Sequence, residues 1–113
     1  MNEYKALLER IHLLEFHQKL LVKMIKNPDM DFYRIIVEHG ISKQEMESFF
    51  NLCDELSLKL KKQKAEGFVH FHPLFVEFVA GLPLELDIKE IVKACLVQKL
   101  YVPLFQEFNK FIS

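Results

Sequence analysis

Two pairs of side chains in this sequence have the spacing that metal sites use. Glu9 and His12 are three residues apart, like the ligand pairs that helices contribute to di-iron bundles. Such a site needs a second pair of the same kind, and no other Glu-x-x-His occurs in the chain. His70 and His72 would share one side of an extended segment, but no Cys or Asp nearby completes a four-ligand set. We therefore predict no metal and no cofactor.

The residues that could act as nucleophiles are also in unsuitable surroundings. Cys53 and Cys95 occupy apolar positions of helical patterns, where a buried thiol is unreactive, and we predict that both stay reduced. No serine is flanked by glycines as at a strand-to-helix elbow, and three scattered glycines cannot build a phosphate-binding loop. The sequence therefore favours a protein that is not an enzyme.

Composition narrows the class of protein further. The chain has 113 residues, 50% of them hydrophobic and 27% charged, which is typical of one folded domain, here predicted to span residues 1–113. The formal net charge of −1 creates no field that would gather nucleic acid or anionic lipid. The apolar runs are too short for a membrane span or a secretory leader, so we predict a cytoplasmic protein with no membrane partner.

Helix signals follow one another along the chain. Asn27-Pro28 and Gly40 end two predicted helices, and Ser42 with Glu45 has the pattern of a capping box that begins a third. The predicted fold class is all-α: a single multihelical domain of five to six helices around a long N-terminal helix. The predicted helices cover about residues 2–26, 28–39, 43–66 and 73–81, then a helix from Asp87 and another from Pro103, with residues 68–72 as a linker.

The predicted first helix is apolar on two opposite sides. On its broader face, a heptad seam with alternating spacings of three and four adjoins Leu8 and Val22. We expect that face to be the core face. The narrower second stripe, roughly opposite, leaves two alternatives: the helix runs through the middle of the domain with other elements on both sides, or the stripe forms an oligomer interface. The seam consists of Tyr4, Leu7, Ile11, Leu14, Gln18, Leu21 and Ile25, and the second stripe of Leu13, Phe16, His17, Leu20 and Met24.

Gln18 is the one polar residue of the seam. A lone amide in an apolar seam costs stability unless it is hydrogen-bonded, and its best attested use is to set register or oligomeric state. The sequence leaves two interpretations open: Gln18 sets the register of a helix pair, or it simply bonds to a neighbouring chain segment or a water.

The predicted third helix has a seam of the same kind. Its apolar residues also alternate by three and four, and its length is close to that of the first helix. We therefore expect the two long helices to pack side by side at a shallow angle. The seam of the third helix consists of Met46, Phe49, Cys53, Leu56 and Leu60.

Residues 34–54 have the outline of a helix-turn-helix, and DNA binding is the alternative function. The turn contains Gly40 and the second helix would be the recognition helix. Recognition helices normally present basic and amide side chains, whereas this one carries four carboxylates that would face a polyanion. The carboxylates belong to Glu45, Glu47, Asp54 and Glu55.

Three further features carry a resemblance to a known family: the long opening helix, the segment His39-Gly40-Ile41-Ser42, and the Pro-Leu-Phe-x-Glu-Phe segment that begins at Pro103. In these the chain resembles the YhaI-like family of uncharacterised small helical proteins from Bacillus and relatives. The resemblance implies an all-helical cytoplasmic protein, and it carries no catalytic residue onto this sequence.

Taken together, the patterns favour a non-catalytic interaction or structural module that associates with itself. An unidentified protein partner is a further option, and a Phe-rich helical bundle also has the composition to hold a small apolar ligand. Nucleic acid is disfavoured as a partner by the charge balance.

Overall fold

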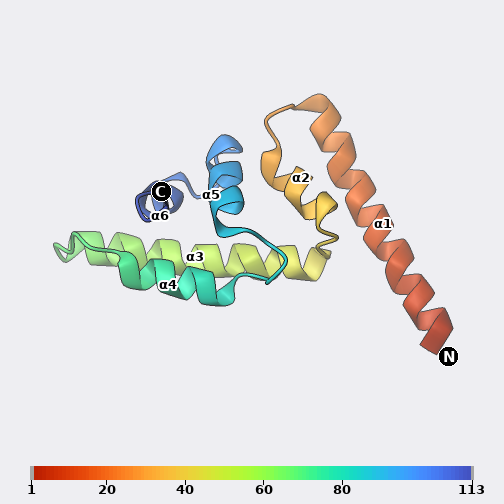
Figure 1. Cartoon of the computed structure of the whole chain (residues 1–113), viewed down its shortest axis with the longest axis horizontal. Coiled ribbons are helices and arrows are strands. Elements are labelled where there is room, and N and C mark those ends of the chain that lie inside the picture. The colour runs from red at the N-terminus through yellow and green to blue at the C-terminus, as the bar shows by residue number, and fades with distance from the viewer. Residues whose placement is uncertain (1, 113) are drawn as a thin grey trace.

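The computed structural model describes residues 2–112, and it is all-α, as predicted. Figure 1 shows the order of the helices, and no strand occurs among the described residues. The helices are α1 (Asn2–Lys26), α2 (Asp31–Glu38), α3 (Lys43–Ala65), α4 (His72–Gly81), α5 (Ile88–Val97) and α6 (Val102–Asn109).

Local signals set most helix boundaries. The Ser42 hydroxyl accepts from the Glu45 backbone N–H at 3.1 Å while the Glu45 carboxylate accepts from the Ser42 N–H, so the predicted capping box begins α3. Gly40 ends α2 with a φ of +64°, a conformation that suits a residue without a Cβ. α2 begins later than predicted because the Asn27 side chain accepts from the Asp29 N–H, which holds residues 27–29 in a turn.

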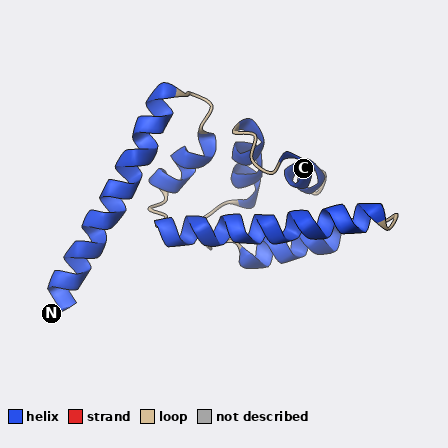
Figure 2. Cartoon of the chain, turned by 180° about the vertical axis from the view of Figure 1, so that it is seen from behind, coloured by secondary structure: helices blue, strands red, loops and turns tan. Residues whose placement is uncertain are grey.

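Helix α3, rather than α1, holds the centre of the fold. α4 and α6 pack on α3, α5 packs on α6 and α2, and α1 packs on α2 at the edge of the molecule (Figures 1 and 2). The prediction that the two long helices lie side by side is wrong, because the shorter α4 runs along α3 in that place. The long N-terminal helix is present as predicted, but the other helices are not arranged around it.

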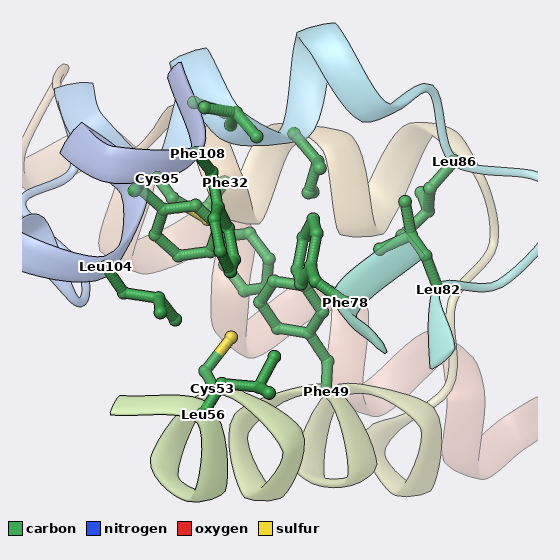
Figure 3. Close-up of a cluster of buried hydrophobic side chains, with 14 of the residues drawn as sticks. Phe32, Phe49, Cys53, Leu56, Phe78, Leu82, Leu86, Cys95, Leu104 and Phe108 are labelled. Carbon is green, nitrogen blue, oxygen red and sulfur yellow. The ribbon is translucent and has the colours of Figure 1, made fainter. Parts of the chain in front are cut away.

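Within the core, four helices contribute aromatic rings to one cluster. Phe49 of α3 stacks on Phe105 of α6 with ring centroids 6.4 Å apart, and Phe78 of α4 meets Phe108 of α6 at 5.1 Å. Phe32 of α2 stacks on Phe49 at 5.1 Å, so α2 is tied into the same cluster (Figure 3). Large flat side chains from elements far apart in sequence therefore hold α2, α3, α4 and α6 together.

The broader face of α1 is exposed, which contradicts its prediction as the core face. The exposed fractions of Tyr4, Leu7, Leu14 and Ile25 are 75, 62, 61 and 84%. The packing partner of α1 is α2, which has eight residues against the 25 of α1. At about 1.5 Å per residue, α2 can cover only about a third of the length of α1, and it covers the opposite side.

Candidate interaction surface

The second stripe of α1 lies against the protein's own chain. His17 and Leu20 are buried, and Leu13, Phe16 and Met24 are half-buried. Leu20 belongs to the buried core cluster, and Phe16 packs against it. The prediction that this stripe is an oligomer interface is therefore wrong for its central residues, since α2 and the following turn already occupy them.

His17 anchors α1 to the turn between α2 and α3. Its ring Nε2 donates a hydrogen bond of 2.8 Å to the backbone carbonyl of Ile41, and the residue is 8% exposed. The bond satisfies a polar group that would otherwise be buried without a partner. No local pattern indicates this contact, because His17 and Ile41 lie 24 residues apart in the chain.

The fold leaves the seam of α1 uncovered. All seven of its residues are exposed, and the adjoining Leu8 and Val22 are 40 and 47% exposed. From Tyr4 to Ile25 the seam is about 32 Å long. Gln18 lies at its centre, and no hydrogen bond of its side chain occurs within residues 2–112. A contiguous apolar strip of this length is characteristic of an interaction site.

The overall dimensions show the same excess of surface. A folded protein of 13.4 kDa typically exposes about 6,500 Å², and this one exposes 7804 Å². Its radius of gyration is 16.0 Å, whereas a compact domain of this length is expected near 13 Å. The additional surface of about 1,300 Å² exceeds the roughly 800 Å² that each partner buries in an interface of standard size.

An open cleft of about 820 Å³ separates the N-terminal half of α1 from the beginning of α3. Leu13 and Phe16 of α1 form its apolar wall, and Gly40, Ser42 and Lys43 face them. A second cleft of about 420 Å³ continues along α1 toward Tyr33. Both clefts lie beside α1, outside the Phe-rich core in which the sequence suggested an apolar pocket.

Comparison with known families covers nearly the whole chain. A family model described as a protein of unknown function, DUF1878, matches residues 4–113. The chain belongs to DUF1878. The match confirms membership of an uncharacterised family, without the YhaI-like name or the Bacillus origin that the resemblance implied, and it assigns no activity to any residue.

The two residue pairs with metal-ligand spacing are not completed by further ligands among the described residues of this DUF1878 protein. Glu9 and His12 lie on the exposed part of α1, while His70 is exposed and the His72 ring packs edge-on against Phe111 at 5.0 Å. Neither pair belongs to a group of three ligand side chains within the described part of the chain.

The fold assembles a trio that sequence reasoning missed. One ligand atom each of Glu38, His39 and Glu90 lies within 4.8 Å of the others, where the end of α2 meets the first turn of α5. The Glu38 carboxylate is already paired with Arg34 at 3.2 Å, and both side chains are about half exposed. The arrangement is that of a solvated ion pair, and no local signal joins residues 51 positions apart.

The two cysteines of this DUF1878 protein are buried, as predicted. Both thiols are fully covered, and burial raises the pKa of each far above its usual value. A thiol held in its neutral form is a poor nucleophile.

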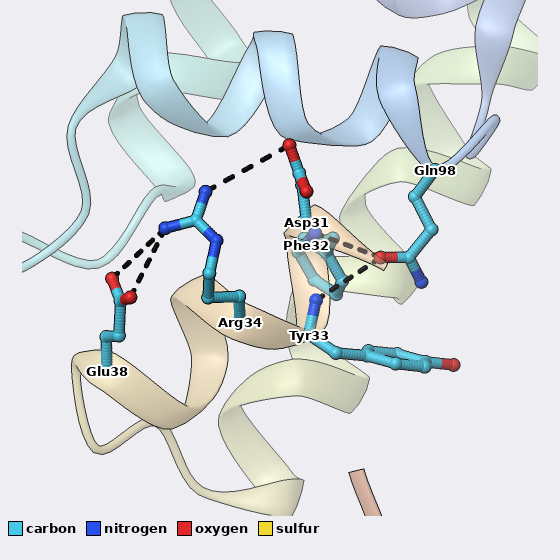
Figure 4. A network of polar contacts seen from close by, with 6 residues as sticks. All are labelled: Asp31, Phe32, Tyr33, Arg34, Glu38 and Gln98. Carbon is cyan, nitrogen blue, oxygen red and sulfur yellow. Dashed lines mark hydrogen bonds and ion pairs between the residues drawn. The ribbon is translucent and has the colours of Figure 1, made fainter. Parts of the chain in front are cut away.

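Gln98 ties α2 to α5 in place of a local helix cap. Met30, the residue before α2, offers no capping side chain, and the Gln98 Oε1 accepts from the backbone N–H groups of Phe32 and Tyr33 at 2.9 and 3.2 Å (Figure 4). Two donors that the first turn of α2 leaves without intrahelical partners are thereby satisfied. Gln98 thus fixes α2, and with it the surface on which α1 rests.

Within the described residues of this DUF1878 protein, no helix combines the length and the apolar character that crossing a membrane requires.

Proposed function

We propose that this DUF1878 protein is a non-catalytic interaction module that associates with a second copy of itself through the seam of α1. The observation that carries the proposal is the exposed apolar seam, with six large apolar side chains that the chain itself does not cover. Burying such side chains contributes about 25 cal/mol per Å² of apolar area removed from water.

The occupant is a second copy because the seam is self-complementary. A two-fold pair needs the same patch on both partners, and a heptad seam is a patch that pairs with its own kind. The excess surface of the chain is also large enough for an interface of standard size. Figure 2 shows α1 at one edge of the molecule with the other helices on one side of it, and every seam residue is exposed.

Sedimentation of the full chain from low to high micromolar concentration tests the proposal. We expect the wild type to associate and Leu14→Asp to remain a monomer, because a carboxylate would then lie in an apolar interface. Leu58→Asp is the matched control, since Leu58 is 71% exposed on α3, away from α1. A wild type that stays monomeric at high micromolar concentration, or equal loss of association in both variants, would contradict self-association.

DNA binding by residues 34–54 is the alternative with a structural observation in its favour. α2 and α3 are joined by a four-residue turn, as in a helix-turn-helix. The exposed side of α3 presents Glu45, Glu47, Asp54 and Glu55, which would repel phosphates. Retention of random-sequence duplex at low salt would support this function, and no retention there removes it.

The narrower resemblance to YhaI-like proteins and the cytoplasmic location stay predictions. The first rests on the long opening helix, His39-Gly40-Ile41-Ser42 and the segment that begins at Pro103, and the second on the short apolar runs of the sequence.

A further inference from the structure

We propose that two copies of α1 pair in parallel and in register, as a two-stranded coiled coil in which Gln18 faces Gln18 of the second copy. This inference rests on the proposed function and specifies the partner's orientation and register. Three independent features of the exposed seam carry it: the residue types at alternate seam positions, the place of its amide, and the charges beside it.

The residue types alternate along the seam as they do in parallel dimers. With Tyr4 as position a of the heptad, the a positions include Ile11 and Ile25, while every d position is leucine. β-branched residues at a with Leu at d favour two parallel strands over three or four. The d positions are Leu7, Leu14 and Leu21.

Gln18, at an a position, discriminates between the two orientations. In a parallel pair in register, the two Gln18 amides face each other, and each can donate to the other's oxygen. The antiparallel registers with the longest overlap place Gln18 opposite Leu14 or Leu7 of the second copy, where the amide has no partner. A buried amide without a partner is destabilising because it loses its hydrogen bonds to water, so parallel pairing is favoured.

The charges beside the seam give the same orientation. Arg10 lies at position g and Glu15 at position e of the next heptad, and both are exposed. In a parallel pair in register, position g of one helix lies beside position e of the next heptad on the other helix. Arg10 of each copy therefore meets Glu15 of the other. The antiparallel register that opposes Gln18 to Leu14 brings the two Glu15 side chains together instead.

The fold leaves room for this pairing. At 100° per residue, the second stripe that carries the body is centred roughly 130° around the helix from the seam, and its residues His17 and Met24 occupy g positions at one flank of the seam. Two bodies would therefore lie on opposite outer sides of the pair. Leu8 and Val22 lie at e positions beside the seam and are 40 and 47% exposed. Pairing would cover part of both side chains.

Disulfide cross-linking of full-length variants tests the orientation. Leu7→Cys and Ile25→Cys are prepared separately, mixed and equilibrated in a glutathione redox buffer. Because the two intact variants have the same mass, the three disulfide-linked pairs are distinguished by the masses of their linked tryptic peptides. The native thiols do not interfere because Cys53 and Cys95 are buried. Glu9→Cys is the matched control, since Glu9 is exposed on the same part of α1 but faces away from the seam.

We expect Leu7→Cys to link to itself and Ile25→Cys to itself, each about tenfold or more above the Glu9→Cys control, because pairing raises the effective thiol concentration. Leu21→Cys is a second probe at a d position with the same expectation. A predominance of the mixed pair, in a chain that sedimentation shows to associate, would overturn the parallel orientation and leave self-association standing. Absence of association would overturn both.

Discussion

Helices α1 and α3 have the same apolar spacing and opposite surroundings. Both are long, and both carry a seam that alternates by three and four residues. In α3, Phe49, Cys53, Leu56 and Leu60 are at most 4% exposed, whereas the apolar residues of the α1 seam are between 45 and 84% exposed. The comparison shows that a heptad pattern identifies an apolar face without identifying what covers it.

The difference arises from what each seam meets in the folded chain. The seam of α3 receives phenylalanines from α4 and α6, whose rings are large enough to fill the space between helices. α1 packs mainly on the short α2. The contact between them uses the second stripe, where His17 and Leu20 are buried. One seam is therefore completed within the chain, whereas the other stays exposed.

The largest expected effect is on the α3 seam. Leu56 is 1% exposed, and Leu56→Ala should lower the free energy of unfolding by about 2–5 kcal/mol, because it removes buried contacts and leaves a cavity. Urea unfolding followed by circular dichroism measures the change. A loss below about 1 kcal/mol, within the range of surface substitutions, would mean that the two seams do not differ as described.

The same substitution at the same heptad position of α1 sharpens the contrast. Leu14→Ala should change the free energy of unfolding of the monomer by less than about 0.5 kcal/mol and weaken association by about 2–3 kcal/mol. Unfolding is measured at a concentration where sedimentation shows a monomer, because association would otherwise add to stability. Destabilisation of the monomer as large as that of Leu56→Ala would show that the seam already has a partner within its own chain.

A third substitution addresses α2, the helix between the two regions. Gln98→Ala would leave the N–H groups of Phe32 and Tyr33 without their acceptor, and we expect a loss of about 1–2 kcal/mol in the free energy of unfolding. Gln106→Ala, at an exposed position of α6, is the control and should be neutral. Equal stability of the two variants would mean that the Gln98 amide does not hold α2 in solution.

The smallest expected effect depends on pH and concerns Glu107 of α6, which pairs with Lys64 near the C-terminal end of α3. Hydrogen bonds from Lys110 and Lys64 hold the pKa of Glu107 below its usual value near 4.5, against the opposing effect of burial. Because the pKa is lower in the folded state, the ionised Glu107 stabilises the fold at pH values above the usual pKa near 4.5. This contribution is lost as the pH falls through the pKa of the folded state. Because both lysines are largely exposed, the contribution is below about 1 kcal/mol.

The measurement compares urea unfolding at pH 7 and at progressively lower pH for the wild type and Glu107→Gln. The wild type should lose its small advantage over the variant below about pH 4.5, and a constant difference at all pH values would contradict the assignment.

Features that depend on near neighbours in the chain were predictable from the sequence. The capping box at Ser42, the left-handed Gly40 and the N-cap at Asp87, which accepts from the Glu90 N–H at 3.0 Å, involve residues at most three apart. The helical periodicity of the apolar residues indicates the type of each element. The structure confirms the predicted all-α class and the long N-terminal helix. The candidate site was predictable only in part, since the seam and Gln18 were recognised while the side of α1 that stays open was not.

The sequence by itself determined which residues share a face of each helix, because that depends on the 100° step between successive residues. Only the tertiary structure decided which face is covered. That choice depends on contacts such as His17 with Ile41 and Gln98 with Phe32, which join residues 24 and 66 positions apart. The helical periodicity of the sequence does not indicate such a contact, because the packing of the other helices brings these residues together.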